Sequence, residues 1–193
     1  MTEHISAKSE ALIFDLDGTL VDSTQAHYAA WYQTLREVGI DLDRDTFQEL
    51  FGKTTEDLLK ELEAESGKKL PAETLSRKKD EYFGRNITMV LPNQPVVEVV
   101  TQYCGVLPLA VATNENMGIA NMVLRSVGLQ PRFDILVGGN EVSRPKPAPD
   151  LFLECAARLG LSPERCHVFE DSRYGIEAAG AAGMSVTDVR PYL

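Results

Sequence analysis

Two acidic pairs stand out because each one ends a short apolar run. Asp15 and Asp17 end the segment ALIFDLDG, and Glu170 and Asp171 end CHVFED. Side chains two residues apart in an extended strand point the same way, so Asp15 and Asp17 should share a face while Gly18 lets the chain turn. Four carboxylates gathered at one sheet edge repel one another unless a cation or a shared proton relieves the charge. The pattern predicts a hard-cation site, and Mg²⁺ suits an oxygen-only ligand set.

Two further positions add a hydroxyl group and a cation. Thr113 ends the run LPLAVAT, with Asn114 expected at the start of a helix, and Lys146 lies in RPKPAPD, where three prolines stiffen the loop. Each feature also has a simpler interpretation. A DxDG segment is common in surface turns, Thr113 or Asp171 could cap a helix, and Lys146 could belong to a solvated turn.

These residues need a scaffold that brings them to one edge. Apolar runs of strand length alternate with helix-length segments, which indicates βαβ units and a doubly wound parallel sheet in an α/β protein. Ligands bind such sheets at the carboxyl ends of the strands. The expected strands are Ala11–Leu16, Leu107–Thr113, Phe133–Gly139, Cys166–Asp171 and Met184–Val189, and the expected helices lie around Pro95–Tyr103, Met117–Val127, Pro149–Leu159 and Tyr174–Ala182.

Residues 24–89 break this rhythm. They carry helical stripes such as Trp31, Leu35 and Val38, a capping signature at Thr54 and Asp57, and no convincing strand. We therefore predict a catalytic core over residues 1–23 and 90–193 and a small inserted helical unit over residues 24–89. The alternative is that these helices simply pack on the sheet.

The composition narrows the class of partner. The chain has 193 residues, 44% hydrophobic and 25% charged, with a net charge of −10, which is ordinary for a globular protein and unfavourable for binding nucleic acid. Its three cysteines, Cys104, Cys155 and Cys166, form no C-x-x-C pair, so we expect reduced, buried thiols. The polar first residues and the lack of a long apolar stretch predict a cytoplasmic protein without a membrane partner. We expect a monomer.

In combination, these motifs resemble those of the haloacid dehalogenase superfamily of aspartyl phosphotransferases. The four motifs of that superfamily match the segment DLDGT at 15–19, Thr113, Lys146 with Pro147, and Glu170 with Asp171. The inserted helices are similar to the small helical cap of its β-phosphoglucomutase-like subgroup. The C-terminal segment is similar to that of short sugar-phosphate phosphatases of the fructose-1-phosphate phosphatase type.

The resemblance implies a catalytic role for four residues. Asp15 would be the nucleophile that forms an aspartyl-phosphate, and Asp17 would protonate the leaving oxygen and then activate water. Thr113 and Lys146 would hold the phosphoryl oxygens, and Asn114 would join them in binding substrate. Because charge spreads over these oxygens in the transition state, positioned donors and fixed positive charge are what the reaction needs.

The resemblance also implies a magnesium site. Mg²⁺ would be held by Asp15, by the backbone carbonyl of Asp17 and by Asp171, with Glu170 next to them. The substrate would be a small phosphate ester.

Four residues of the inserted segment are further candidates for substrate binding. His27 and Lys78 match positions that approach the catalytic acid and the substrate, and Gly52 matches a loop that reaches over the active site. His27 could instead pack on a helical stripe, and Lys78 could belong to a solvated face. Thr55 stands where the mutases of the superfamily have an arginine that grips a second phosphate.

The sequence leaves several functions open. Without a guanidinium at position 55, a bisphosphate should be held less firmly, which favours hydrolysis over a hexose-phosphate mutase. A phosphoacceptor receiver domain also combines a doubly wound sheet with an acidic Mg²⁺ site, a phosphorylated aspartate, a threonine and a lysine. It is shorter, however, and lacks the inserted helices and the second acid of the DxD pair. A non-catalytic scaffold would show no turnover of any phosphate ester.

Overall fold

The computed structural model describes residues 1–2, 5–51 and 53–193. The chain divides into two compact units, one made of residues 1–22 and 91–193 and the other of residues 23–90. We call them the core unit and the helical unit. That the helical unit serves as a cap stays a prediction.

A parallel sheet of five strands forms the centre of the core unit within the described residues, in the order β5-β4-β1-β6-β7. The chain adds β4 and β5 on one side of β1 and then crosses to add β6 and β7 on the other side. The predicted doubly wound sheet is therefore confirmed. The strands are β1 (Ala11–Phe14), β4 (Leu109–Ala112), β5 (Ile135–Val137), β6 (Cys166–Glu170) and β7 (Ser185–Asp188).

Every strand is shorter than the apolar run that predicted it. All residues of β1, β4 and β6 are buried, as expected for a parallel sheet covered on both faces. The polar residues directly after β1 and β4 stay attached to the sheet through one backbone bond each, from the amide of Asp15 to the carbonyl of Phe169 and from the amide of Thr113 to the carbonyl of Val137. A separate antiparallel pair, β2 (Val21–Asp22) with β3 (Leu91–Pro92), lies where the chain leaves and re-enters the core unit.

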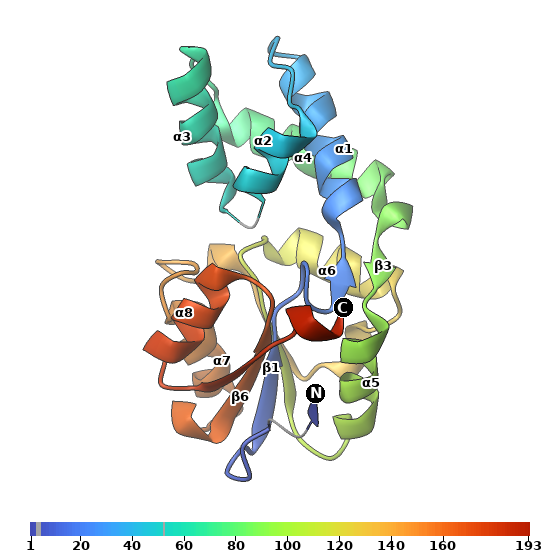
Figure 1. The fold of residues 1–193 in the computed structure, drawn as a ribbon, viewed down its shortest axis with the longest axis vertical. Helices are drawn as coiled ribbons and strands as arrows, with labels where there is room; N and C mark the ends of the chain where they lie inside the picture. The colour runs from blue at the N-terminus through green and yellow to red at the C-terminus, as the bar shows by residue number, and fades with distance from the viewer. Residues whose placement is uncertain (3–4, 52) are drawn as a thin grey trace. The chain divides into compact units, whose positions relative to one another are not determined.

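Helices cover both faces of the sheet, with α7 and α8 on one face and α5 and α6 on the other (Figure 1). Phe152 and Cys155 of α7 and Ala178 of α8 pack in one buried cluster with Ile13 and Val168 of the sheet. The helices are α5 (Gln94–Tyr103), α6 (Met117–Ser126), α7 (Asp150–Leu159) and α8 (Arg173–Ala181), with short 3-10 helices η3 (Gln130–Arg132), η4 (Gly139–Glu141), η5 (Pro163–Arg165) and η6 (Arg190–Tyr192).

The start of α6 corrects one expectation. Asn114 is not at the start of this helix, because Asn116 is the N-cap and its side chain accepts a hydrogen bond from the amide of Ile119. Thr113 instead closes a turn, in which its Oγ1 accepts from the amide of Glu115 at 3.1 Å. The loop between β4 and α6 is thus longer than predicted, and Asn114 lies within it.

The helical unit contains α1 (Thr24–Arg36), α2 (Arg44–Leu50), α3 (Thr55–Ser66), α4 (Ala72–Arg85) and η2 (Ile87–Met89). It has its own buried core, which includes Trp31 and Leu35, with Val38 partly buried against it. Thr54 is the N-cap of α3 and accepts from the amide of Asp57, as the capping signature predicted. Nowhere in the described residues is a helix long and apolar enough to cross a membrane.

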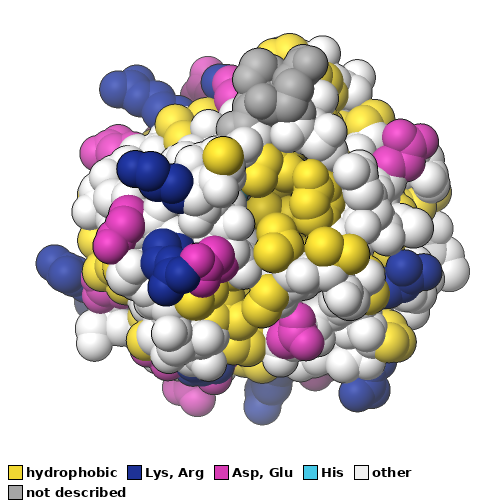
Figure 2. Space-filling model, turned by 90° about the horizontal axis from the view of Figure 1, so that it is seen from below, with side chains coloured by type: hydrophobic (Ala, Val, Ile, Leu, Met, Phe, Trp, Pro, Cys, Tyr) yellow, Lys and Arg dark blue, Asp and Glu magenta, His cyan; other side chains and the backbone are white. Residues whose placement is uncertain are grey.

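The face of the molecule seen in Figure 2 shows hydrophobic side chains at its centre, with acidic and basic side chains scattered around them. A cavity of about 300 Å³ in the core unit is lined by side chains of α5, by Tyr192 and by the first two residues. The residues predicted to do chemistry do not line this cavity.

Candidate active site

The register of the sheet brings three strand ends together. Phe14, the last residue of β1, pairs with Val111 of β4 and with Phe169 of β6. Asp15 therefore follows β1 at the same edge at which Thr113 follows β4 and Glu170 ends β6. This edge lies where the strand order reverses around β1, which is the usual ligand site of doubly wound sheets.

Three of the four predicted carboxylates gather at this edge. Oxygen atoms of Asp15, Glu170 and Asp171 lie within 4.8 Å of one another, whereas Asp17 is not part of this group. The strand alternation that predicted a shared face for Asp15 and Asp17 does not extend that far, because β1 ends at Phe14 and the chain turns at Gly18. A contact through the backbone carbonyl of Asp17 stays a prediction.

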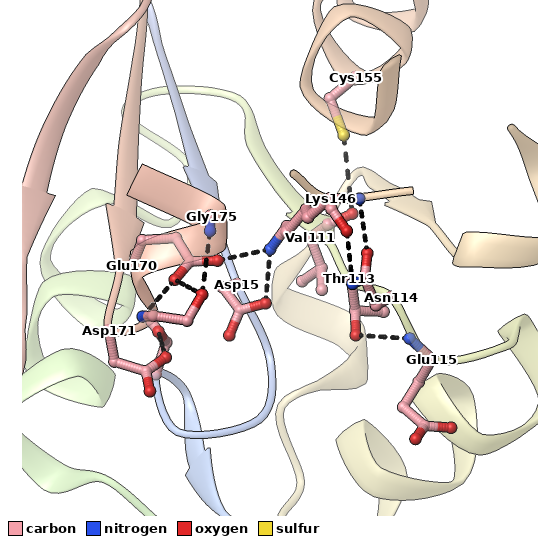
Figure 3. Close-up of polar contacts among 12 residues, drawn as sticks. Asp15, Val111, Thr113, Asn114, Glu115, Lys146, Cys155, Glu170, Asp171 and Gly175 are labelled. Atoms are coloured by element: carbon pink, nitrogen blue, oxygen red, sulfur yellow. Dashed lines mark hydrogen bonds and ion pairs between the residues drawn. The ribbon is translucent and has the colours of Figure 1, made fainter. Parts of the chain in front are cut away.

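Lys146 reaches into this group from the loop that precedes α7. Its Nζ donates to Oδ1 of Asp15 at 2.6 Å and to Oε1 of Glu170 at 2.7 Å (Figure 3). The ammonium group also lies 4.9 Å from the ring centroid of Phe152. Lys146 is only 6% exposed, so the interpretation of this segment as a solvated turn is wrong for the lysine.

The charges in this group shift the pKa values of its members. Burial raises the pKa of Asp15 well above its usual value, and Glu170 and Asp171 raise it further, while Lys146 opposes the shift. Burial and then Glu170 raise the pKa of Asp171 to about 6. Burial lowers the pKa of Lys146, but Asp15 and Glu170 more than offset this effect and the net shift is upward.

The donor set fits a hard divalent cation. All three converging groups are carboxylates, and the ammonium of Lys146 forms ion pairs with two of them. The repulsion among three neighbouring carboxylates favours a further cation, and oxygen ligands suit Mg²⁺.

Two residues that the sequence did not single out fix the carboxylate of Glu170. Oε2 of Glu170 accepts from the backbone amide of Ser172 at 2.7 Å and from its hydroxyl at 3.0 Å. A Cβ atom on Gly175 would overlap the same carboxylate, so this position in the first turn of α8 leaves space for Glu170. Ser172 is also the N-cap of α8, which shows that the interpretation of Asp171 as the helix cap is wrong.

Asp171 is held by the segment that follows β1. Its Oδ1 accepts from the hydroxyl of Thr19 at 2.9 Å. Gly18 has a φ of +91°, and a Cβ atom there would overlap the Asp171 carboxylate. Glycine is therefore needed at position 18 for the turn and also for space, and only the turn could be inferred from the sequence.

The two remaining predicted residues of the core unit lie beside Lys146. Thr113 is buried, and Asn114 uses its side-chain amide to bind the backbone of Lys146. Figure 3 shows both side chains next to the lysine. A direct contact of either residue with substrate stays a prediction.

The predicted substrate residues of the helical unit have mixed environments. His27 is buried, and its ring centroid lies 4.3 Å from that of Phe83. Thr55 is the first residue of α3, and Lys78 is partly exposed and paired with Glu37. Gly52 lies outside the described residues. Their roles in substrate binding stay predictions.

The run 77–79 in α4 is not uniformly solvated. Lys79 is only 1% exposed, and its Nζ lies 5.4 Å from the ring centroid of Phe83 and 3.7 Å from a carboxylate oxygen of Asp80. The sequence of the basic run 77–79 contains no signal that distinguishes the buried Lys79 from the partly exposed Lys78.

The fold and the carboxylate group define a hydrolase of a known family. Residues 12–189 match the model of the haloacid dehalogenase-like hydrolases, and the chain belongs to that family. This membership confirms the resemblance found in the motifs and decides against a receiver domain.

Several relatives of known name cover almost the whole chain. Fructose-1-phosphate phosphatase YqaB of Escherichia coli is 38% identical over 179 residues, which are 93% of this chain and 95% of that protein. Beta-phosphoglucomutase of Bacillus subtilis is 28% identical over 93% of this chain and 83% of its own length. The crystal structure of CbbY from Rhodobacter sphaeroides in complex with phosphate has a TM-score of 0.83 at 26% identity, and the match covers 93% of this chain and 86% of that one.

Proposed function

We propose that this phosphatase hydrolyses a small phosphorylated sugar, that it depends on Mg²⁺, and that Asp15 carries the phosphoryl group in a covalent intermediate. The observation that supports this most strongly is the contact of Lys146 with both Asp15 and Glu170 beside Asp171. It joins a nucleophile candidate, a fixed cation and a metal-binding donor set at one sheet edge.

The reaction would proceed in two displacements. In the first, a carboxylate oxygen of Asp15 forms a bond to phosphorus as the bond from phosphorus to the sugar oxygen breaks, and Asp17 donates a proton to that oxygen. In the second, Asp17 takes a proton from water, whose oxygen attacks phosphorus and releases Asp15 and inorganic phosphate. Lys146 and Thr113 would bind the phosphoryl oxygens, on which negative charge is spread in the transition state.

Asp15, the backbone carbonyl of Asp17 and Asp171 would hold Mg²⁺, with Glu170 next to them. When bound, the ion supplies positive charge that favours the ionised form of Asp15 and attracts the phosphate of the substrate. Because burial and the two neighbouring carboxylates raise the pKa of Asp15, a compensating cation is what the nucleophile requires.

The substrate class rests on the named relatives. A phosphatase of fructose 1-phosphate matches 93% of this chain, and a related structure binds phosphate. We propose that His27, Gly52, Thr55 and Lys78 of the helical unit contribute to the choice of sugar. The protein would act as a monomer on a small ester, and its net charge of −10 disfavours nucleic acid as a partner.

A panel of phosphorylated sugars and other small phosphate esters tests this function. We expect release of inorganic phosphate with Mg²⁺, a loss of release in EDTA, and recovery when Mg²⁺ is restored. Full turnover in EDTA would contradict the metal dependence. Turnover of none of the esters would contradict the phosphatase itself.

A hexose-phosphate mutase is the second candidate, because beta-phosphoglucomutase of Bacillus subtilis matches 93% of this chain. The two activities are separated by incubating the protein with glucose 1-phosphate and a bisphosphate primer. We expect inorganic phosphate to exceed glucose 6-phosphate among the products, because Thr55 cannot bind a second phosphate as a guanidinium would. Predominant formation of glucose 6-phosphate would favour the mutase.

A further inference from the structure

The side-chain amide of Asn114 forms two hydrogen bonds with a single residue of another loop. Its Oδ1 accepts from the backbone amide of Lys146 at 2.9 Å, and its Nδ2 donates to the backbone carbonyl of Lys146 at 3.2 Å (Figure 3). This pairing resembles the two-bond pairing between residues of neighbouring strands. It restricts both the position and the rotation of the Lys146 backbone.

Asn114 is itself attached to the end of the sheet. The amide of Thr113 donates to the carbonyl of Val137 at 3.1 Å, and the amide of Gly139 donates to the carbonyl of Glu115 at 2.8 Å. A Cβ atom on Gly139 would overlap the carbonyl of Asn114, so the two loops are in close contact. The residues on either side of Asn114 are therefore fixed to the loop that follows β5.

The position of the Lys146 backbone decides where its ammonium group lies. A lysine side chain has four flexible bonds, and here it must reach Asp15 and Glu170 at once, at 2.6 and 2.7 Å. A displacement of about 1 Å at a reacting group can cost about two orders of magnitude in rate. The loop that carries Lys146 thus needs an anchor near the sheet.

We infer that Asn114 is a positioning residue that acts through Lys146. Its side chain holds the lysine backbone so that the ammonium group meets Asp15, and a direct contact with the substrate is not its main role. This inference rests on the proposed function, in which Lys146 binds the phosphoryl group.

A double-mutant cycle tests the inference with the sugar phosphate that the wild type hydrolyses fastest. We expect Asn114→Ala to lower kcat/KM by about 10- to 100-fold in the otherwise unchanged protein. In a Lys146→Ala background the same substitution should lower kcat/KM by less than about twofold, because its only route of action is already absent. Equal losses in both backgrounds would show that Asn114 acts without Lys146 and would overturn the inference.

A matched control comes from the neighbouring loop that follows β5. Oδ1 of Asn140 accepts from the backbone amide of Met117 at 3.0 Å, so this asparagine ties the first residue of α6 to the loop that follows β5. We expect Asn140→Ala to keep kcat/KM within about twofold of the wild type. A loss as large as that in Asn114→Ala would mean that general loosening of the loop explains the effect, and would also overturn the inference.

Hydrogen exchange gives a readout that does not depend on turnover. In Asn114→Ala the amide of Lys146 loses its acceptor, so its exchange measured by NMR should be at least about tenfold faster. The amide of Ile119, which donates to Asn116 Oδ1 at 3.0 Å, serves as the internal reference and should be unchanged. Unchanged exchange at Lys146 would overturn the inference, whereas a wild type without turnover would contradict only the proposed function.

Discussion

The Nζ atom of Lys146 lies 2.6 Å from Oδ1 of Asp15, although 131 positions of sequence separate the two residues. Only 3% of the lysine side chain and 10% of the aspartate side chain are exposed. Burying an ion pair costs desolvation energy that the attraction between the charges does not always offset. The pair is therefore better explained by chemistry at this edge than by stability alone.

Asp15→Asn should abolish phosphate release and leave the metal-free protein as stable as the wild type or more stable. The pKa of Asp15 is raised, chiefly by burial and also by Glu170 and Asp171, so the folded protein disfavours the charged form that asparagine lacks. Phosphate release and thermal unfolding in EDTA measure the two effects. Asp41→Asn, at an exposed position, is the control and should change neither.

Appreciable turnover by Asp15→Asn would contradict a covalent route through this residue. A clearly lower melting temperature would show that the ion pair with Lys146 outweighs the burial and the two neighbouring carboxylates. The control separates both outcomes from a general effect of removing one negative charge.

Stability in the absence of metal should fall as the pH rises through the range set by Asp171. Its pKa is raised from 3.8 to about 6, so within this range the folded state holds a proton that the unfolded chain has released. We expect Asp171→Asn, in EDTA, to raise the free energy of unfolding by roughly 1 to 3 kcal/mol near pH 7.5. The gain should be clearly smaller near pH 4.5. Urea unfolding of both proteins at the two pH values measures this difference.

Addition of Mg²⁺ near pH 7.5 should reverse the order of stability. The wild type should gain more than Asp171→Asn, because a ligand that binds only the folded state stabilises it in proportion to its affinity. Equal gains in the two proteins would contradict the assignment of Asp171 as a metal ligand.

Much of the fold and part of the site could be predicted from local patterns. Apolar runs that end in Asp15, Thr113 and Glu170 indicate buried parallel strands, and parallel strands place their carboxyl ends at one edge. Strand order could not be predicted from local patterns, because the position of β1 between β4 and β6 depends on pairings between distant segments. Local sequence carries no record of such pairings.

The contacts of single side chains could not be predicted for the same reason. Asn114 was expected at a helix start, yet it binds Lys146, 32 positions away in the sequence. The need for glycine at position 175 is also a tertiary effect, because the carboxylate of Glu170 occupies the space that a Cβ atom would fill. β1 ends three residues before Asp17, so strand alternation does not determine the direction of the Asp17 side chain. Each of these depends on tertiary packing or on the exact end of a strand.

The three cysteines should differ sharply in reactivity. Cys155 is fully buried, and burial raises the pKa of its thiol to about 12; burial also raises the pKa of Cys166. A raised pKa leaves little thiolate at pH 8, and the thiolate is the form that reacts. Cys104 is only half-buried, which corrects the expectation that all three are buried. Iodoacetamide should therefore label Cys104 first in the native protein, as read by peptide mass spectrometry.

Labelling of Cys155 and Cys166 should require denaturant. Modification of Cys155 at the rate of Cys104 under native conditions would contradict the burial of Cys155 between α7 and the sheet. Alkylation of Cys104 alone should leave phosphate release unchanged, because this residue is not part of the proposed site.

Two glycines of α8 should respond to alanine in opposite ways. A Cβ atom on Gly175 would overlap the carboxylate of Glu170, which is fully buried and bound to both Ser172 and Lys146, so it can move aside only by giving up these bonds. A Cβ atom on Gly180 would meet nothing within 4 Å. We expect Gly175→Ala to lower the free energy of unfolding by about 1 to 3 kcal/mol, as overpacking does.

Gly180→Ala should instead raise the free energy of unfolding by about 0.5 to 1 kcal/mol, because alanine favours the helix. Gly175→Ala should also lower kcat/KM by about tenfold or more, since the displaced Glu170 carboxylate no longer holds Lys146 in place. Gly180→Ala should leave kcat/KM unchanged. Urea unfolding and steady-state kinetics of the two variants measure both effects. If Gly175→Ala had the stability and activity of Gly180→Ala, the carboxylate of Glu170 would be free to move. That result would contradict a fixed position of Glu170 beside Asp15.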